Sequence, residues 1–149
     1  DVCSSDLIMI VSIVSAFIST IGFSIVFHIQ KKHLLICGTV GALGWAIYLL
    51  LERMGASTVL ASFVAALVVT QASYFLSKRR KTPITVFLIA GIIPLVPGLG
   101  LYRTMFAILE SNYSSAIEYA TLTFEIAGVI AGAIVIISLL PLLWRKPRR

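Results

Sequence analysis

Charged side chains are scarce in this sequence. Only 12% of its 149 residues are charged, whereas 59% are hydrophobic and the mean hydropathy is +1.03. An ordinary soluble domain carries roughly twice that charged fraction. A water-soluble fold of this length would have to expose large apolar patches, which soluble monomers avoid. The composition therefore excludes a soluble domain of enzyme size and favours a protein that lies in lipid.

Cysteine is almost absent, and so are the motifs of catalysis and metal binding. The two cysteines, Cys3 and Cys37, are predicted to lie in opposite halves of the membrane, where they cannot form a disulfide. No Cys/His spacing indicates a metal site. The sequence contains no Gly-x-Ser-x-Gly motif, no His-Glu-x-x-His motif and no paired intramembrane aspartates. We therefore expect neither an enzyme nor a bound cofactor or metal.

Most of the sequence consists of long apolar segments. A membrane-spanning helix needs about 20 mainly apolar residues, because the hydrocarbon core is about 30 Å thick. Five segments come close to this length or exceed it: residues 7–29, 34–51, 59–76, 83–109 and 117–143. They leave little sequence for anything else. We predict an all-α, polytopic membrane helix bundle in which residues 1–149 form a single transmembrane domain.

Basic residues alternate between the connections and predict the orientation. The formal net charge is +6, which in a soluble protein would suggest nucleic-acid binding. Lysine and arginine beside membrane spans stay on the cytoplasmic side. Ten of the twelve basic residues follow the first, third and fifth segments: Lys31 and Lys32, residues 78–81, and Arg145, Lys146, Arg148 and Arg149. We therefore expect five crossings with the N-terminus outside and the C-terminus in the cytoplasm, contact with membrane lipid, and no nucleic-acid partner.

The fourth segment is interrupted near residues 94–98. Pro94 and Pro97 each lack an N–H group, and Gly98 tolerates unusual backbone angles. The half-helix before the break has eleven residues and would rise about 16 Å, so the break is expected near the bilayer midplane. Two half-helix ends there would offer free carbonyls near Gly91 and free N–H groups near Gly98, which together suit a carboxylate or a zwitterion. A simple proline kink is the alternative.

Two ionisable residues lie inside the predicted spans. Arg103 is seven residues before Glu110, and Glu125 is seven residues after Glu118, so both are expected about 10 Å inside the outer boundary. Charged groups inside a membrane are costly, usually paired and often functional. We therefore predict an Arg103–Glu125 ion pair, which is either structural or exchanges with substrate or a proton.

At Pro94-x-x-Pro97-Gly98, with Tyr102 following, the chain resembles the ThrE-type threonine/serine exporter family. Within that family it is similar to the short YjjB-like subunit, which corresponds to the family's C-terminal membrane half. The likeness covers most of the chain, in residues 22–27, 41–45 and 82–104.

The resemblance implies a secondary exporter of small, threonine- or serine-like amino acids in the cell inner membrane, driven by the membrane potential or a proton gradient. For two-gene versions it implies export of a dicarboxylate such as succinate. It also implies that the chain assembles with a second membrane subunit related to the family's N-terminal half. Assembly of several copies of this chain into a homo-oligomer is a further alternative. The alternative of another class is a non-transporting assembly subunit. Together with the broken helix, the resemblance predicts that the substrate is bound by Gly91, Pro94, Pro97, Gly98, Tyr102 and Arg103. It also predicts that Arg103 and Glu125 take part in proton or charge coupling.

Overall fold

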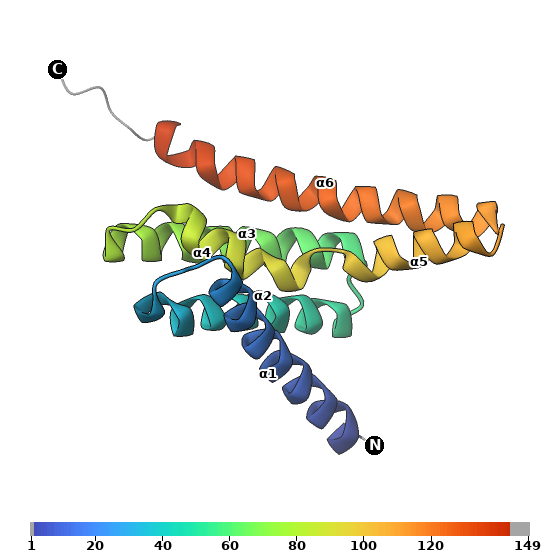
Figure 1. Ribbon diagram of the computed structural model, residues 1–149, viewed down its shortest axis with the longest axis horizontal. Coiled ribbons are helices and arrows are strands. Elements are labelled where there is room, and N and C mark those ends of the chain that lie inside the picture. Colours follow the sequence, from blue (N-terminus) through green and yellow to red (C-terminus); the bar gives the residue numbers. More distant parts are fainter. Residues whose placement is uncertain (1, 144–149) are drawn as a thin grey trace.

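Residues 2–143, the part of the chain that the computed structural model describes, form six α-helices and one short 3₁₀ helix (Figure 1). No strand occurs within these residues. Four helices are long and apolar enough to cross a membrane, and α4 with α5 forms a fifth, bent candidate. The predicted all-α membrane helix bundle is confirmed. The elements are α1 (Val2–Val26), α2 (Lys31–Arg53), α3 (Thr58–Arg80), α4 (Ile84–Ile92), η1 (Ile93–Leu95), α5 (Gly98–Leu109) and α6 (Tyr113–Leu143).

Short turns with local stop signals separate α2, α3 and α4. Gly55 has a φ of 85°, a left-handed conformation that glycine adopts without steric penalty. The side chain of Ser57 then caps α3 by accepting the N–H of Leu60 at 3.3 Å. The helix ends at Arg80, its C-cap residue Lys81 has a left-handed φ of 50°, and Pro83 directly precedes α4. These turns reverse the chain within a few residues and hold neighbouring helices antiparallel.

Successive turns lie at opposite ends of the bundle. The α1–α2 and α3–α4 turns share one end, whereas the α2–α3 turn lies at the opposite end of α2 and α3, and α5 carries the α5–α6 turn well beyond it (Figure 1). Lys31, Lys32 and residues 78–81 therefore gather at the first end. The basic residues predicted to join them, within 144–149, lie outside the described residues. The start of α1 and the end of α6 lie at opposite ends, which is the arrangement that an odd number of crossings requires.

The centre of the bundle is packed through small residues. Gly91 of α4 lies against two valines, and a Cβ atom added to it would lie 2.6 Å from Cγ1 of Val40 on α2 and 2.9 Å from Cγ1 of Val69 on α3. Gly44 of α2 likewise meets Val69. Leu95 of η1 is buried in the same hydrophobic core. Three helices thus approach closely just before the break, which fixes the position of the break in the bundle.

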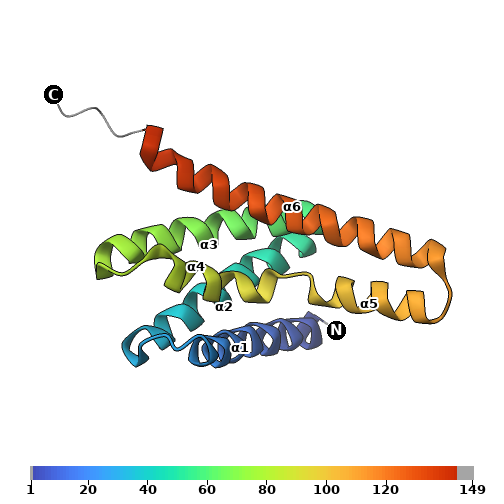
Figure 2. The same ribbon diagram turned by 45° about the horizontal axis from the view of Figure 1, so that its top comes forward.

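The fourth hydrophobic segment is broken at the predicted position. The first part runs from Ile84 to Leu95, and α5 starts at Gly98 at an angle of 48° to it. Pro94 lies in the first turn of η1 and Val96 is extended, so the ladder of helical hydrogen bonds is interrupted. Beyond the break, the backbone of α5 approaches only α6 among the described helices. Figure 2 shows α5 running beside α6 to the turn that joins them.

Candidate functional site

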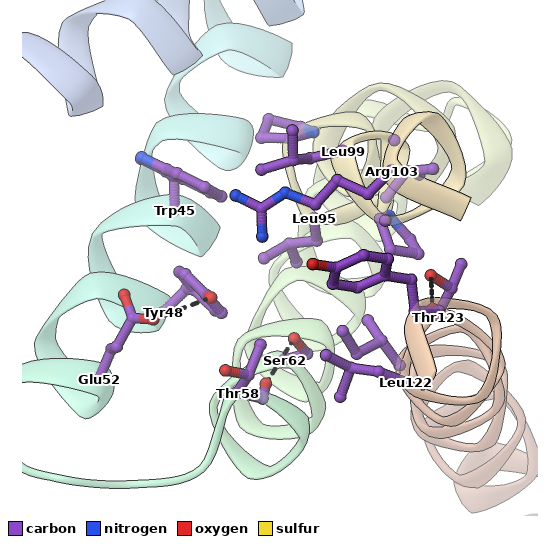
Figure 3. Close-up of a pocket in the computed structure, with 17 residues that line it drawn as sticks. Trp45, Tyr48, Glu52, Thr58, Ser62, Leu95, Leu99, Arg103, Leu122 and Thr123 are labelled. Carbon is purple, nitrogen blue, oxygen red and sulfur yellow. Dashed lines mark hydrogen bonds between the residues drawn. The ribbon is translucent and has the colours of Figure 1, made fainter. Parts of the chain in front are cut away.

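A cavity of about 390 Å³ lies beside the break (Figure 3). Small-molecule sites typically have volumes of about 300–1,000 Å³. Four parts of the chain line the cavity: Trp45, Tyr48 and Glu52 from α2; Thr58 and Ser62 from α3; residues 94–100 and Arg103 from the break and α5; and Tyr119, Leu122, Thr123 and Ile126 from α6. A hollow with polar and charged groups is therefore present beside the interrupted helix.

The first turn of α5 forms one wall of this cavity. Its N-cap residue, Pro97, provides no side-chain hydrogen bond. The N–H of Gly98 bonds to the carbonyl two residues before it at 2.7 Å, and the N–H of Leu101 bonds to Pro97 O at 3.2 Å. The N–H groups of Leu99 and Gly100 lie between these two, in the turn where a helix has no internal partners for its donors. Because a helix N-terminus carries positive potential, this wall favours an anionic group.

Gly100 allows this turn to lie directly on α6. A Cβ atom at position 100 would collide with Oγ1 of Thr123. That hydroxyl donates a hydrogen bond to the carbonyl of Tyr119 at 2.6 Å, so it is held in place. Glycine is required here by the close approach of the two helices. The contact fixes the α5 wall against α6.

Arg103 brings a full positive charge to the same wall. Its Cζ atom lies 5.9 Å from the centre of the Tyr119 ring, within the range of a cation–π attraction. In Figure 3 the side chain extends from α5 toward Trp45 on α2. Within the described chain the only ion pair is that of Arg53 with Asp6. The guanidinium of Arg103 therefore lines the cavity without a carboxylate partner.

The wall opposite the break comes from α2. The hydroxyl of Tyr48 donates a hydrogen bond to Oε1 of Glu52 at 3.3 Å. The Tyr48 ring stacks on Trp45 with a centroid distance of 5.0 Å and an interplanar angle of 19°. Below them on α3, Ser62 donates to the carbonyl of Thr58 at 2.8 Å. The cavity thus has a positive wall and a wall with one carboxylate, joined by aromatic and hydroxyl groups (Figure 3).

Comparison with known proteins places the chain in a family. The family described as "Threonine/Serine exporter, ThrE" matches residues 12–140, a stretch that includes every residue lining the cavity. The chain belongs to the ThrE family. It is therefore a multi-pass membrane protein of a transporter family, as the resemblance and the apolar helices predict.

One relative is considerably longer than this ThrE chain. An uncharacterized protein of Haemophilus influenzae is 32% identical over 130 residues, which cover 85% of this chain and 44% of the relative. The ThrE chain thus spans less than half of that relative's length. No solved structure matches the chain significantly.

The structure brings together four of the predicted substrate-binding residues of this ThrE chain. Pro94, Pro97, Gly98 and Arg103 all line the cavity. Gly91 does not, because it is buried in the packing of α2, α3 and α4. Tyr102 is not among the lining residues either: its side chain is 63% exposed, and its ring stacks on that of Phe106 with the centroids 6.0 Å apart.

The predicted Arg103–Glu125 ion pair is not formed. Glu125 is exposed, lies outside the cavity lining, and makes no ion pair within 4.0 Å in the described part of the chain. The side of α6 that faces the cavity carries Thr123 and Ile126, and Glu125 lies between them in sequence, about 100° away from Ile126 around the helix. A matched depth in the membrane does not fix the rotation of a helix about its axis, which explains the difference.

The residues of the α2 and α3 walls are absent from the site that the sequence predicts. A usable signal is nevertheless present. Tyr48 and Glu52 are four residues apart, as are Thr58 and Ser62, so each pair shares a helix face. The two pairs flank one short turn and therefore lie at the same end of adjacent helices. Among the described residues, no group of His, Cys, Asp or Glu side chains is arranged to hold a metal ion.

Proposed function

We propose that this chain is a subunit of a secondary exporter that moves small, threonine- or serine-like amino acids out of the cell. The observation that carries the proposal is the cavity beside the broken helix, where the first turn of α5 and Arg103 form one wall. The ThrE family's name, a threonine/serine exporter, supports the same substrate class. We further propose that the chain lies in the cell inner membrane with its N-terminus outside, because its basic turns share one end of the bundle.

The positive wall suits the carboxylate that every amino acid carries. Arginine and the N–H groups at a helix N-terminus both recognise carboxylates, and a charge-assisted hydrogen bond is roughly twice as strong as a neutral one. Discontinuous helices in transporters use their positive half-helix ends for this purpose. In this proposal the substrate carboxylate lies between Arg103 and the N–H groups of Leu99 and Gly100.

The break also gives the bundle a place to change shape. Alternating access requires part of a transporter to move around the substrate site. Here α5 meets α4 at 48°, and the residues between them are held by few hydrogen bonds of the backbone. We propose that α5 changes its angle to α4 during transport while α6 moves with it, because Gly100 and Thr123 lie in direct contact. The coupling role of Glu125 stays a prediction.

Arg103→Gln tests the proposal. Efflux of preloaded L-serine and L-threonine should fall at least tenfold, because a charged hydrogen bond contributes roughly 1.5–3 kcal/mol to binding. Arg79→Gln is the matched control: Arg79 is exposed at the opposite end of the bundle, and three basic neighbours keep the charge of that end. Efflux is measured per amount of protein in the membrane. Unchanged efflux of both amino acids in Arg103→Gln would refute the assignment of the cavity.

A non-transporting assembly subunit is the second candidate. The observation that favours it is that α5 packs against α6 alone, so that Leu101, Met105 and Leu109 are exposed on its outer side. The combined replacement of Pro94 and Pro97 by alanine separates the two candidates. The transport proposal expects the variant to assemble with its membrane partner and to lose efflux. The assembly candidate expects the complex itself to be lost, which co-purification from detergent would show.

A further inference from the structure

Glu52 and Arg103 carry opposite charges into one cavity without pairing with each other. Both line the cavity, from α2 and from α5 respectively. The ion pair of Arg53 and Asp6 is the only one within 4.0 Å among the described residues, so the carboxylate of Glu52 and the guanidinium of Arg103 stay apart. In Figure 3 the two side chains come from different sides of the hollow. A ligand placed between them meets a cation on one side and an anion on the other.

The carboxylate of Glu52 is held on the cavity side of α2. The Tyr48 hydroxyl donates to its Oε1 at 3.3 Å, one helical turn away. Tyr48 is fixed in turn by stacking on Trp45 at 5.0 Å, and all three residues line the cavity. A carboxylate beside aromatic rings is a suitable environment for an ammonium group, because ring faces also attract cations. Tyr48 and Glu52 form what we call the ammonium subsite, and Trp45, toward which Arg103 extends, supports the Tyr48 ring by stacking.

We propose that Glu52, positioned by Tyr48, binds the ammonium group of the substrate and makes the cavity selective for α-amino acids over dicarboxylates and hydroxy acids of similar size. This inference rests on the proposed function, since it assumes that the cavity holds the exported solute. An α-amino acid is a zwitterion and matches both walls. A dicarboxylate such as succinate would bring a second negative charge against Glu52, and like charges in contact oppose binding. A hydroxy acid would leave Glu52 without a cationic partner.

Binding to the full chain in lipid nanodiscs tests the inference with three probes. L-serine carries an ammonium group, glycerate has a hydroxyl in its place, and succinate has a second carboxylate. In Glu52→Gln we expect L-serine binding to weaken about ten- to a hundredfold, the range given by a charged hydrogen bond. Glycerate binding should stay within about twofold and succinate binding should improve, so the preference for serine over glycerate collapses. Tyr48→Phe should weaken L-serine binding less than Glu52→Gln does, because only one hydrogen bond is removed.

Two further variants separate failure of the inference from failure of the proposed function. Glu118→Gln makes the same chemical change on α6, at an exposed residue outside the cavity lining, and should leave all three probes unaffected. Arg103→Gln should weaken serine and glycerate alike. If Arg103→Gln does this while Glu52→Gln weakens both probes equally or neither, the inference is overturned and the proposed function stands. If the parent chain binds no probe and Arg103→Gln leaves efflux intact, both are overturned.

Discussion

Replacement of Gly91 by alanine should destabilise the protein, and the structure sets the size of the effect. The added Cβ atom would lie 2.6 Å from Cγ1 of Val40 and 2.9 Å from Cγ1 of Val69. Carbon atoms in contact prefer about 3.5–4.0 Å, so each neighbour has to move by about 1 Å. Neither valine can turn away cheaply, because a β-branched side chain in a helix has one strongly preferred rotamer. The two valines lie on α2 and α3, so α4 has to shift away from both.

Overpacking of this kind costs about 1–3 kcal/mol. For a chain of about 150 residues, 1 kcal/mol corresponds to a change of about 2–4 °C in the midpoint of thermal unfolding. We therefore expect Gly91→Ala to lower the midpoint by about 2–12 °C. Thermal unfolding of the purified protein in detergent, followed by the fraction that remains monodisperse after heating, measures the shift.

Gly128→Ala is the matched control for this experiment. Gly128 is also a helical glycine, on α6, but no atom lies within 4 Å of an added Cβ. Alanine favours helix over glycine by up to about 1 kcal/mol, so the midpoint should stay unchanged or rise. Equal losses in the two variants, or no loss in Gly91→Ala, would refute the packing described for the region before the break.

Three shorter predictions follow from other contacts. Gly100→Ala should impair L-serine binding because the added Cβ atom would collide with Oγ1 of Thr123. Addition of Thr123→Ala should restore much of this binding. If the double variant shows no restoration, the close contact of α5 with α6 is contradicted. Asp6→Asn should change the free energy of unfolding by less than about 1 kcal/mol, because both side chains of the Asp6–Arg53 ion pair are exposed. A larger loss of stability in thermal unfolding would contradict that exposure. Cys37 is fully buried, so maleimide should label it only after denaturation and not in native membranes, as measured by mass spectrometry. Rapid labelling of Cys37 in native membranes would contradict the packing of α2 against α4.

Local chemistry explains which parts of the structure could be predicted. The break depends on Pro94 and Pro97, which remove backbone donors wherever they lie, so its position followed from the sequence. The cavity depends on how α2, α3 and α6 are rotated and tilted around that break. The rotation of each helix about its axis is decided by packing between helices. In lipid, the side of a helix that faces protein and the side that faces hydrocarbon are both apolar, so the sequence pattern does not distinguish them. The sequence therefore predicts no role for Glu52 in the cavity, and it predicts for Glu125 an ion-pair partner that Glu125 does not contact.

The uncapped first turn of α5 has a practical consequence for mutational scanning. Two of the groups that face the proposed carboxylate are amides of the main chain, at Leu99 and Gly100, and they persist whatever side chain is installed there. An alanine at position 99 leaves its amide in place, and an alanine at position 100 reports crowding against Thr123 instead of recognition. A library of point variants would thus score this turn as tolerant or merely structural. Amide-to-ester replacement by semisynthesis removes the donor itself and would reveal what a conventional scan passes over.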